Sequence, residues 1–114
     1  MSVGKQTFEV SVADTPFLRA KGLSFIEHLA ENTGMLFVFD AVDYHRFWMK
    51  DTFLPLDLIW ISEDLKVQHV KTLEPCEAKI ECPTYGPFVQ SKYVLEVNGG
   101  AFKGQVGDLV TLQD

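Results

Sequence analysis

The sequence has too few basic residues for a protein that follows a phosphate backbone. Ten lysines and arginines stand against sixteen aspartates and glutamates, which gives a formal net charge of -6 at pH 7. Proteins that bind nucleic acid or adsorb to anionic membranes present a basic face instead. We therefore expect no nucleic-acid partner. The one tight basic cluster is Arg19-Ala20-Lys21.

Long apolar runs are missing as well. No stretch approaches the roughly 18 residues of a membrane helix, so we expect no membrane insertion. Residues 1–6 carry no apolar run of signal-peptide length, so we expect no export signal in the chain as it stands, and the compartment stays open. The length of 114 residues suits a single domain spanning 1–114, whose oligomeric state the sequence does not specify.

Common catalytic and metal-binding motifs are absent. The sequence has no P-loop, no G-x-G-x-x-G and no G-x-S-x-G elbow, which argues against the common nucleotide-dependent enzymes. The three histidines, His28, His45 and His69, share no ligand spacing, and no calcium loop is present. We therefore expect neither a metal nor a cofactor.

Only two cysteines are present, Cys76 and Cys82. Their C-x5-C spacing does not fit the C-x2-C of thioredoxin-type motifs, and His69 is the only histidine near enough to complete a zinc site. Four states remain open: two free thiols, a disulfide, half of a metal site, or a redox pair. We expect a disulfide in an exported protein, where it would stabilise the loop by roughly 2–3 kcal/mol, and free thiols in a cytosolic one.

The sequence is rich in short strand patterns. Alternating or continuous apolar runs, separated by turn residues, favour a mainly β fold, a compact β-sandwich or distorted barrel of about seven or eight short strands. Thr15-Pro16 and Gly22 are typical of the start and end of one short helix over 17–21. The nine phenylalanines suggest a shared core of rings, and the long segment 74–90 is expected to be functional or pinned. The expected strands cover 7–13, 34–39, 46–51, 56–61, 66–72, 92–98 and 106–112.

Five sequence blocks occur in one order across nearly the whole chain, from about Phe8 to Val110. They are RAKGL (19–23), GMLFVF (34–39), FWMKDT (47–52), PLD (55–57) and YVLEV (93–97). Together these blocks resemble the bacterial and archaeal family known as domain of unknown function 192. The resemblance implies a compact, mainly β fold and no established activity. Because many members look secreted or membrane-tethered, it also implies an extracytoplasmic setting.

Four positions depart from the family pattern. Ser24 stands where methionine is usual, and Asp51 where asparagine is usual. Leu65 replaces the usual turn glycine, and Ile26 stands where an arginine is common. If that arginine binds an anion in relatives, Ile26 cannot do so here.

Two carboxylates lie in strand patterns that are otherwise apolar. Asp57 shares a strand face with Ile59 and Ile61, and a structural role would have it accept hydrogen bonds from backbone amides or Thr52, or pair with Lys50. Glu96 raises the same question in the strand 92–98. If the two strands were neighbours, the two carboxylates could work as an acid/base pair, which is the basis of a hydrolase-like alternative.

Aromatic and basic residues surround these carboxylates in the sequence. Trp48 and Trp60 suit stacking on a sugar ring, in a groove lined with Arg46, Lys50 and Tyr44. We therefore expect a non-catalytic small-ligand-binding or accessory domain for a small polar or carbohydrate-like molecule. A structural or protein-interaction module is a further alternative. The candidate ligand-binding residues are Arg46, Trp48, Lys50, Asp57, Trp60 and Glu96.

Overall fold

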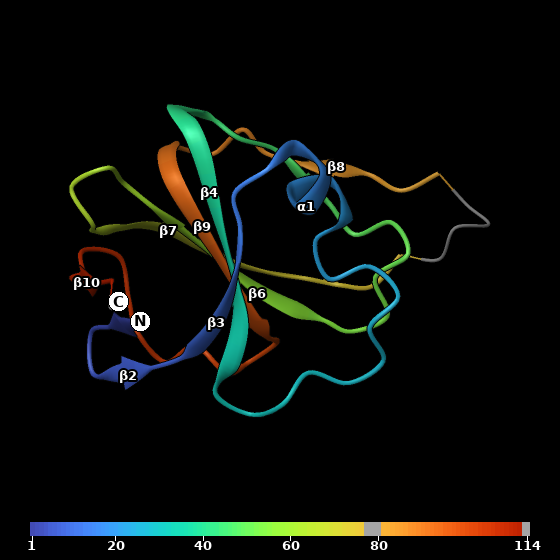
Figure 1. Ribbon diagram of the computed structural model, residues 1–114, viewed down its shortest axis with the longest axis horizontal. Helices are drawn as coiled ribbons and strands as arrows, with labels where there is room; N and C mark the ends of the chain where they lie inside the picture. Colours follow the sequence, from blue (N-terminus) through green and yellow to red (C-terminus); the bar gives the residue numbers. More distant parts are fainter. Residues whose placement is uncertain (77–80, 113–114) are drawn as a thin grey trace.

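The computed structural model describes residues 1–76 and 81–112. Within these residues the chain forms ten strands in three sheets and one short helix (Figure 1). The fold is mainly β, as the sequence predicts, and the sheets do not close into a barrel.

A five-stranded sheet forms the middle of the molecule, in the order β3-β4-β9-β6-β7. β3 and β4 run parallel, and the other neighbouring pairs are antiparallel. Parallel neighbours cannot be joined by a tight hairpin, so the chain crosses from β3 to β4 through helix α1 and a long loop. The strands are β3 (Glu9–Ala13), β4 (Thr33–Tyr44), β9 (Gln90–Asn98), β6 (Leu56–Ile61) and β7 (Val67–Leu73).

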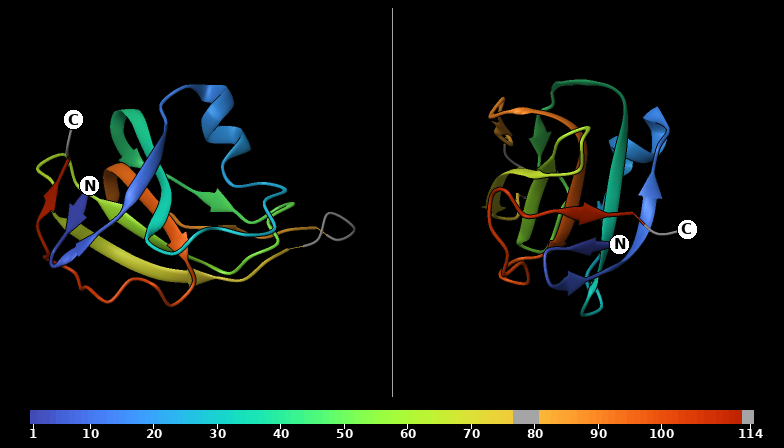
Figure 2. Two further views of the ribbon diagram at one scale, coloured as in Figure 1. Left: turned by 60° about the horizontal axis from the view of Figure 1, so that its bottom comes forward. Right: turned by 90° about the vertical axis from the view of Figure 1, so that its left-hand side faces the viewer.

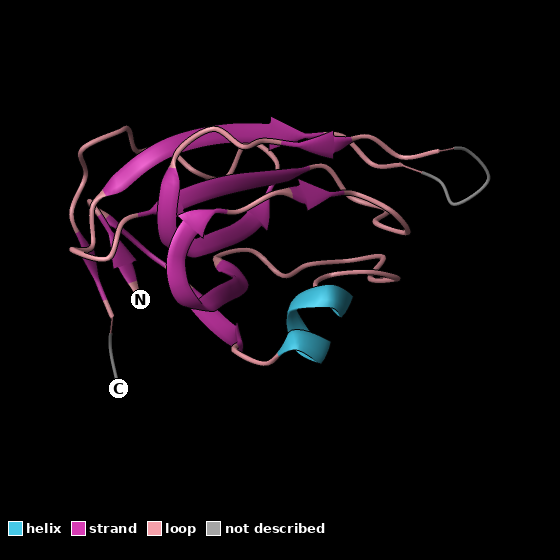
Figure 3. Ribbon diagram, turned by 90° about the horizontal axis from the view of Figure 1, so that it is seen from above, coloured by secondary structure: helices cyan, strands magenta, loops and turns pink. Residues whose placement is uncertain are grey.

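Helix α1 (Pro16–Lys21) begins and ends where local sequence signals predict. The Thr15 hydroxyl accepts a hydrogen bond from the Leu18 N–H at 3.1 Å, and Pro16 occupies the first turn, where its missing N–H costs nothing. Gly22 ends the helix with φ +50°, a conformation that favours glycine. Figure 3 shows the helix set apart on one side of the strands.

A separate hydrophobic core lies on each face of the middle sheet. A small sheet, in the order β10-β1-β2, covers one of these two cores. This small sheet lies at the same end of the molecule as the N-terminus (Figure 2). On the other face lie α1, its loop and a two-stranded sheet, β5-β8. Because both faces are covered, β6 is buried at every position. The short strands are β1 (Ser2–Val3), β2 (Gln6–Thr7), β10 (Val110–Thr111), β5 (Phe47–Trp48) and β8 (Thr84–Tyr85).

Several local expectations are corrected by the structure. β1 and β2 were not predicted, because two residues are too few to show a period. The expected strand 46–51 is only Phe47–Trp48, and the expected loop 74–90 contains β8, with residues 77–80 outside the described part. The phenylalanines divide between core and surface: Phe8, Phe37 and Phe102 are buried, whereas Phe17, Phe25, Phe53 and Phe88 are exposed.

Two departures from the family pattern fall at left-handed backbone positions. Leu65, where the family resemblance implies a turn glycine, has φ +64° in the turn between β6 and β7. Asp51, where the resemblance implies an asparagine, has φ +57°. Aspartate and asparagine both tolerate this conformation, so the exchange at Asp51 is conservative. Leucine tolerates it poorly, so Leu65 brings backbone strain that a glycine would avoid.

Candidate functional site

A cavity of about 360 Å³ lies between α1 and the middle sheet. Its lining comes from α1 and the turn after it, from β4 and β5, from the segment around Lys50, and from β9. We call it the Glu96 pocket, because Glu96 is the only carboxylate among the described residues that line it.

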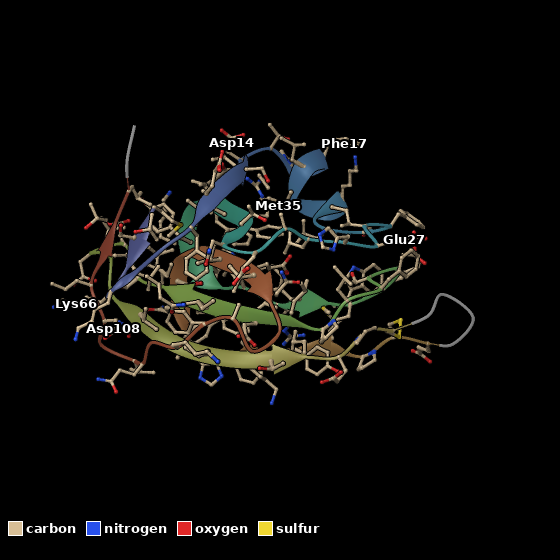
Figure 4. All side chains as sticks on the ribbon, turned by 90° about the horizontal axis from the view of Figure 1, so that it is seen from below. Asp14, Phe17, Glu27, Met35, Lys66 and Asp108 are labelled. Carbon is tan, nitrogen blue, oxygen red and sulfur yellow. A yellow bond between two sulfur atoms is a disulfide. The ribbon has the colours of Figure 1, made fainter. Side chains whose placement is uncertain are left out.

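Glu96 lies within the middle sheet and projects into this cavity. It pairs with Met35 of β4 and Leu58 of β6, so all three side chains share the face that α1 covers. Figure 4 shows Met35 on the same side of the strands as the helix. Glu96 is only 5% exposed, and burial raises its pKa to about 8. The carboxyl group therefore holds its proton at pH 7.

The Glu96 carboxyl group has no protein partner. Among the described residues, none donates a hydrogen bond to it and none forms an ion pair with it. Buried polar groups are normally hydrogen-bonded, and leaving one unpaired costs about 1–3 kcal/mol. The fold alone therefore does not account for this side chain.

Four of the ten basic residues line the same pocket: Arg19, Lys21, Arg46 and Lys50. Arg19 is held in place, because its Nη1 donates to the Val38 carbonyl at 2.9 Å and its Nη2 lies 3.7 Å from Asp40. The other three form no ion pair with any described residue. The pocket is therefore strongly positive in a protein whose overall charge is negative.

Aromatic rings form the walls of the pocket. Phe47 packs edge-on against Phe37, with ring centroids 5.3 Å apart, and against Phe39 at 6.1 Å. Trp48 is 51% exposed at the mouth, and the Lys50 Nζ lies 5.2 Å from the centre of its ring. Hydroxyl groups complete the lining, from Ser24, Thr52 and Thr84.

A second hollow of about 310 Å³ continues outward from the mouth and shares Ala20, Lys21, Ser24, Trp48 and Lys50 with the pocket. The exposed rings of Phe17, Phe25 and Trp48 line it, and the exposed ring of Phe53 packs edge-on against Phe25. We call these four rings the aromatic shelf. Figure 4 shows Phe17 at the outer edge of the molecule.

The backbone holds one ring of the aromatic shelf in an unusual conformation. Phe25 has φ +66°, its N–H donates to the Asp51 carbonyl at 2.8 Å, and its ring meets that of Phe53 edge-on. A bulky residue in this conformation is strained. The loop after α1 is thus tied to the segment that carries Trp48 and Lys50.

Asp57 lies on the opposite face of the sheet from the pocket. It pairs with Val97, whereas Leu58 pairs with Glu96, so Asp57 and Glu96 project to opposite faces. The acid/base pair that the hydrolase-like alternative requires is therefore not formed, and that alternative is wrong.

Asp57 has the structural role that the sequence suggested. It accepts a hydrogen bond from the Thr72 hydroxyl at 2.6 Å and another from the Phe102 N–H at 3.0 Å, so a backbone amide is one of its partners, as expected. Thr52 and Lys50, the side chains that the sequence suggested as partners, line the Glu96 pocket instead. Asp57 therefore ties β6 to β7 and to the turn after β9, and it does not line the Glu96 pocket.

Trp60 is not a pocket residue either. It is fully buried and packs against the rings of Phe47, His69 and Phe88. Of the six candidate residues, the structure gathers Arg46, Trp48, Lys50 and Glu96 in one cavity and places Asp57 and Trp60 elsewhere. Sequence reasoning missed Arg19 and Lys21 as pocket residues, although their basic cluster and its RAKGL block were the available signal.

The segment that carries Lys50 pairs with Cys76. Cys76 and Cys82 form a disulfide with an S–S distance of 2.11 Å, which selects one of the four states left open by their spacing. Cys76 also forms β-bridges with Lys50 and with Thr52. Cys76 therefore helps to position one wall of the pocket.

The chain belongs to the family called domain of unknown function 192, whose model, described as "Uncharacterized ACR", matches residues 1–112. Two solved structures are similar to it, each with 30% sequence identity. One is a protein of unknown function from Novosphingobium aromaticivorans DSM 12444, with a TM-score of 0.78, covering 92% of this chain and 75% of the other. The second, from Sinorhizobium meliloti 1021, is described as a candidate transcription regulator. Its TM-score is 0.75, and the match covers 88% of this chain and 78% of the other. No curated protein matches the sequence.

Neither a membrane-spanning helix nor a metal cluster is present in the described part of the chain. Its single helix is far too short to cross a bilayer. Within residues 1–76 and 81–112, no three side chains of histidine, cysteine, aspartate or glutamate come together as a metal site would need.

Proposed function

We propose that this chain is a non-catalytic binding domain that holds a small polar ligand in the Glu96 pocket. The observation that carries the proposal is the buried Glu96 carboxyl group, which projects into an open cavity without a protein partner. A ligand that accepts a hydrogen bond from this group would give it the partner that no described residue supplies.

The size and walls of the pocket suit a small molecule. Its volume of about 360 Å³ falls near the lower end of the range for ligand sites, roughly 300–1,000 Å³. Rings line the walls and a few polar groups converge at the floor, which is the usual composition of such sites. Because the aromatic shelf shares residues with the mouth, we assign it to the outer part of the ligand rather than to a separate interaction role.

A catalytic role has less support. No second carboxylate lines the pocket among the described residues, so Glu96 has no partner for acid/base chemistry. The family itself is uncharacterised.

A nucleic-acid role also has less support, despite the description of the Sinorhizobium relative. The four cations line a cavity instead of a continuous surface stripe, and the whole chain carries a formal charge of -6. A phosphate backbone would therefore meet a largely negative surface outside the pocket.

The test is NMR observation of the two tryptophan indole N–H signals during titration with neutral sugars, sugar acids, polyols and amino acids. We expect at least one compound to shift the Trp48 signal to saturation and the buried Trp60 signal much less. Trp48→Ala should weaken that binding about fivefold or more, because ring stacking contributes about 1 kcal/mol. Tyr44→Ala is the matched control, since Tyr44 is similarly exposed, at 54%, but lies outside the pocket. If nothing saturates the Trp48 signal, or if both variants weaken binding equally, the proposal is wrong.

A further inference from the structure

The Glu96 pocket has an unusual charge balance. Among the residues that the structure describes, its lining includes four basic side chains and one acidic side chain. Arg19 is paired with Asp40, which leaves Lys21, Arg46 and Lys50 without an ionic partner among the described residues. Cations that converge on a partly enclosed cavity favour a negatively charged guest, because the surrounding apolar walls strengthen the attraction.

We propose that the ligand of the Glu96 pocket is an anionic sugar, bound with its carboxylate or phosphate group between the Glu96 carboxyl and the unpaired cations. This inference rests on the proposed function and names the class of ligand for the same site. Glu96 donates its proton in a hydrogen bond to the anion, and Arg46 and Lys50 supply charge-assisted hydrogen bonds.

The uncharged lining supports the sugar part of the assignment. Trp48 offers a half-exposed flat ring at the mouth, and such rings stack on the apolar faces of sugar rings. Ser24, Thr52 and Thr84 place hydroxyl groups in the same lining, where they can donate to and accept from ligand hydroxyls. A cationic ligand fits poorly, because it would need an ionised Glu96 and would face four positive side chains.

The proton on Glu96 makes the expected binding depend on pH. The charged groups that line the pocket with Glu96 are Arg19 and Lys21 from helix α1 and Arg46 and Lys50 from the segment around β5. Its neighbours in the sheet, Met35 and Leu58, are apolar. Burial raises the pKa of Glu96 to about 8, so this carboxyl group changes charge between pH 6 and 9. Above about pH 8 it becomes an anion and repels the ligand.

The experiment is isothermal titration calorimetry with four probes: glucuronate, glucose 6-phosphate, glucose and inorganic phosphate. We expect both anionic sugars to bind at least tenfold more tightly than glucose, which lacks the charge, and than inorganic phosphate, which lacks the ring. Binding of glucose as tight as that of glucuronate would overturn the anion assignment and leave the proposed function standing. Inorganic phosphate binding as tightly as the anionic sugars would overturn the sugar assignment. If none of the four probes binds while an uncharged or cationic compound saturates the Trp48 signal, the inference is wrong. If no compound does so, the proposed function is also wrong.

A matched pair of lysine variants tests the charge directly. Lys50→Gln should weaken glucuronate binding about tenfold, as expected for loss of one charge-assisted hydrogen bond. Lys71→Gln is the control, because the Lys71 Nζ also lies over an aromatic ring, 5.9 Å from the centre of Phe88, but outside the pocket. Equal effects of the two substitutions would contradict a specific site and indicate only general electrostatic attraction.

Glu96→Gln separates ligand binding from a structural role. Glutamine keeps a hydrogen-bond donor and cannot ionise, so the variant should bind glucuronate at pH 6 within about threefold of the wild type. Between pH 7 and 9 wild-type affinity should fall about tenfold, whereas that of Glu96→Gln should stay flat. A wild-type affinity that does not change with pH, or a variant that changes in parallel with it, would overturn the assigned contact. Urea unfolding of the variant checks that it is folded under each condition.

Discussion

The buried Glu96 predicts that the protein loses stability as the pH rises through neutrality. Its pKa in the folded chain is about 8, against an ordinary value of 4.5, because burial disfavours the charged form. Below pH 4.5 both the folded and the unfolded chain keep the proton, so this residue has no effect on their balance. Between pH 4.5 and 8 only the unfolded chain releases it, so unfolding becomes progressively easier.

The magnitude follows from the difference between the two pKa values. Each pKa unit corresponds to about 1.4 kcal/mol, so the free energy of unfolding falls by up to about 5 kcal/mol between pH 4.5 and 8. Above pH 8 the folded chain ionises as well, and the loss is complete. Since water can enter the pocket, we take about 2 kcal/mol as the smallest effect that the burial of Glu96 would produce.

Glu96→Gln isolates this effect, because glutamine resembles the protonated acid and has no charge to titrate. We expect the stability difference between the variant and the wild type to be small at pH 5 and to grow in favour of the variant by about 2–4 kcal/mol at pH 8. The assay is urea unfolding at pH 5, 6, 7 and 8, followed by the fluorescence of the buried Trp60. Other acids titrate in both proteins and cancel in the comparison.

Glu9→Gln serves as the control, since Glu9 is exposed on the edge strand β3. Its stability difference from the wild type should not change with pH. If the Glu96→Gln difference is as flat as that of Glu9→Gln, the carboxyl group is ionised or solvated in the folded chain, and the argument from its burial fails.

Two further substitutions test the fold on either side of the site. Asp57→Ala should lower the free energy of unfolding by about 1–3 kcal/mol, because the Thr72 hydroxyl and the Phe102 N–H lose their acceptor. The substitution should leave ligand binding at the Glu96 pocket unchanged. An unaltered midpoint of urea unfolding would show that these two hydrogen bonds contribute nothing to stability. Gly34→Ala should lower the free energy of unfolding by about 2 kcal/mol or more, because an added Cβ would lie 2.3 Å from the Glu96 carbonyl oxygen in the neighbouring strand. A midpoint of urea unfolding within error of the wild type would mean that β4 and β9 move apart without cost.

The strands and the helix could be predicted where their signals are local. Thr15, Pro16 and Gly22 define α1 within a few consecutive residues, because capping depends on adjacent backbone groups. The apolar run of β6 and the alternation of β9 are equally local. β1 and β2 are too short for any periodic signal, and they exist because pairing with each other and with β10 satisfies their backbone groups.

The candidate site was predicted in part. Arg46, Trp48 and Lys50 were proposed from one short segment, and the pocket contains all three. Trp60 was proposed from residue type alone. A tryptophan suits a core as well as a groove, and only the covering of this face by Phe47 and Phe88 decides between them.

By itself the sequence determined that the chain is mainly β, where its one helix begins and ends, and which side chains share a face within each strand, since these depend on residues close together along the backbone. Only the tertiary structure decided that Glu96 is opposite Leu58 and that Asp57 is opposite Val97. A shift of one residue in that register would have placed the two carboxylates on the same face. Register and the position of α1 over the sheet arise from packing between distant segments, so the gathering of Glu96 with the cations could be seen only in the folded chain.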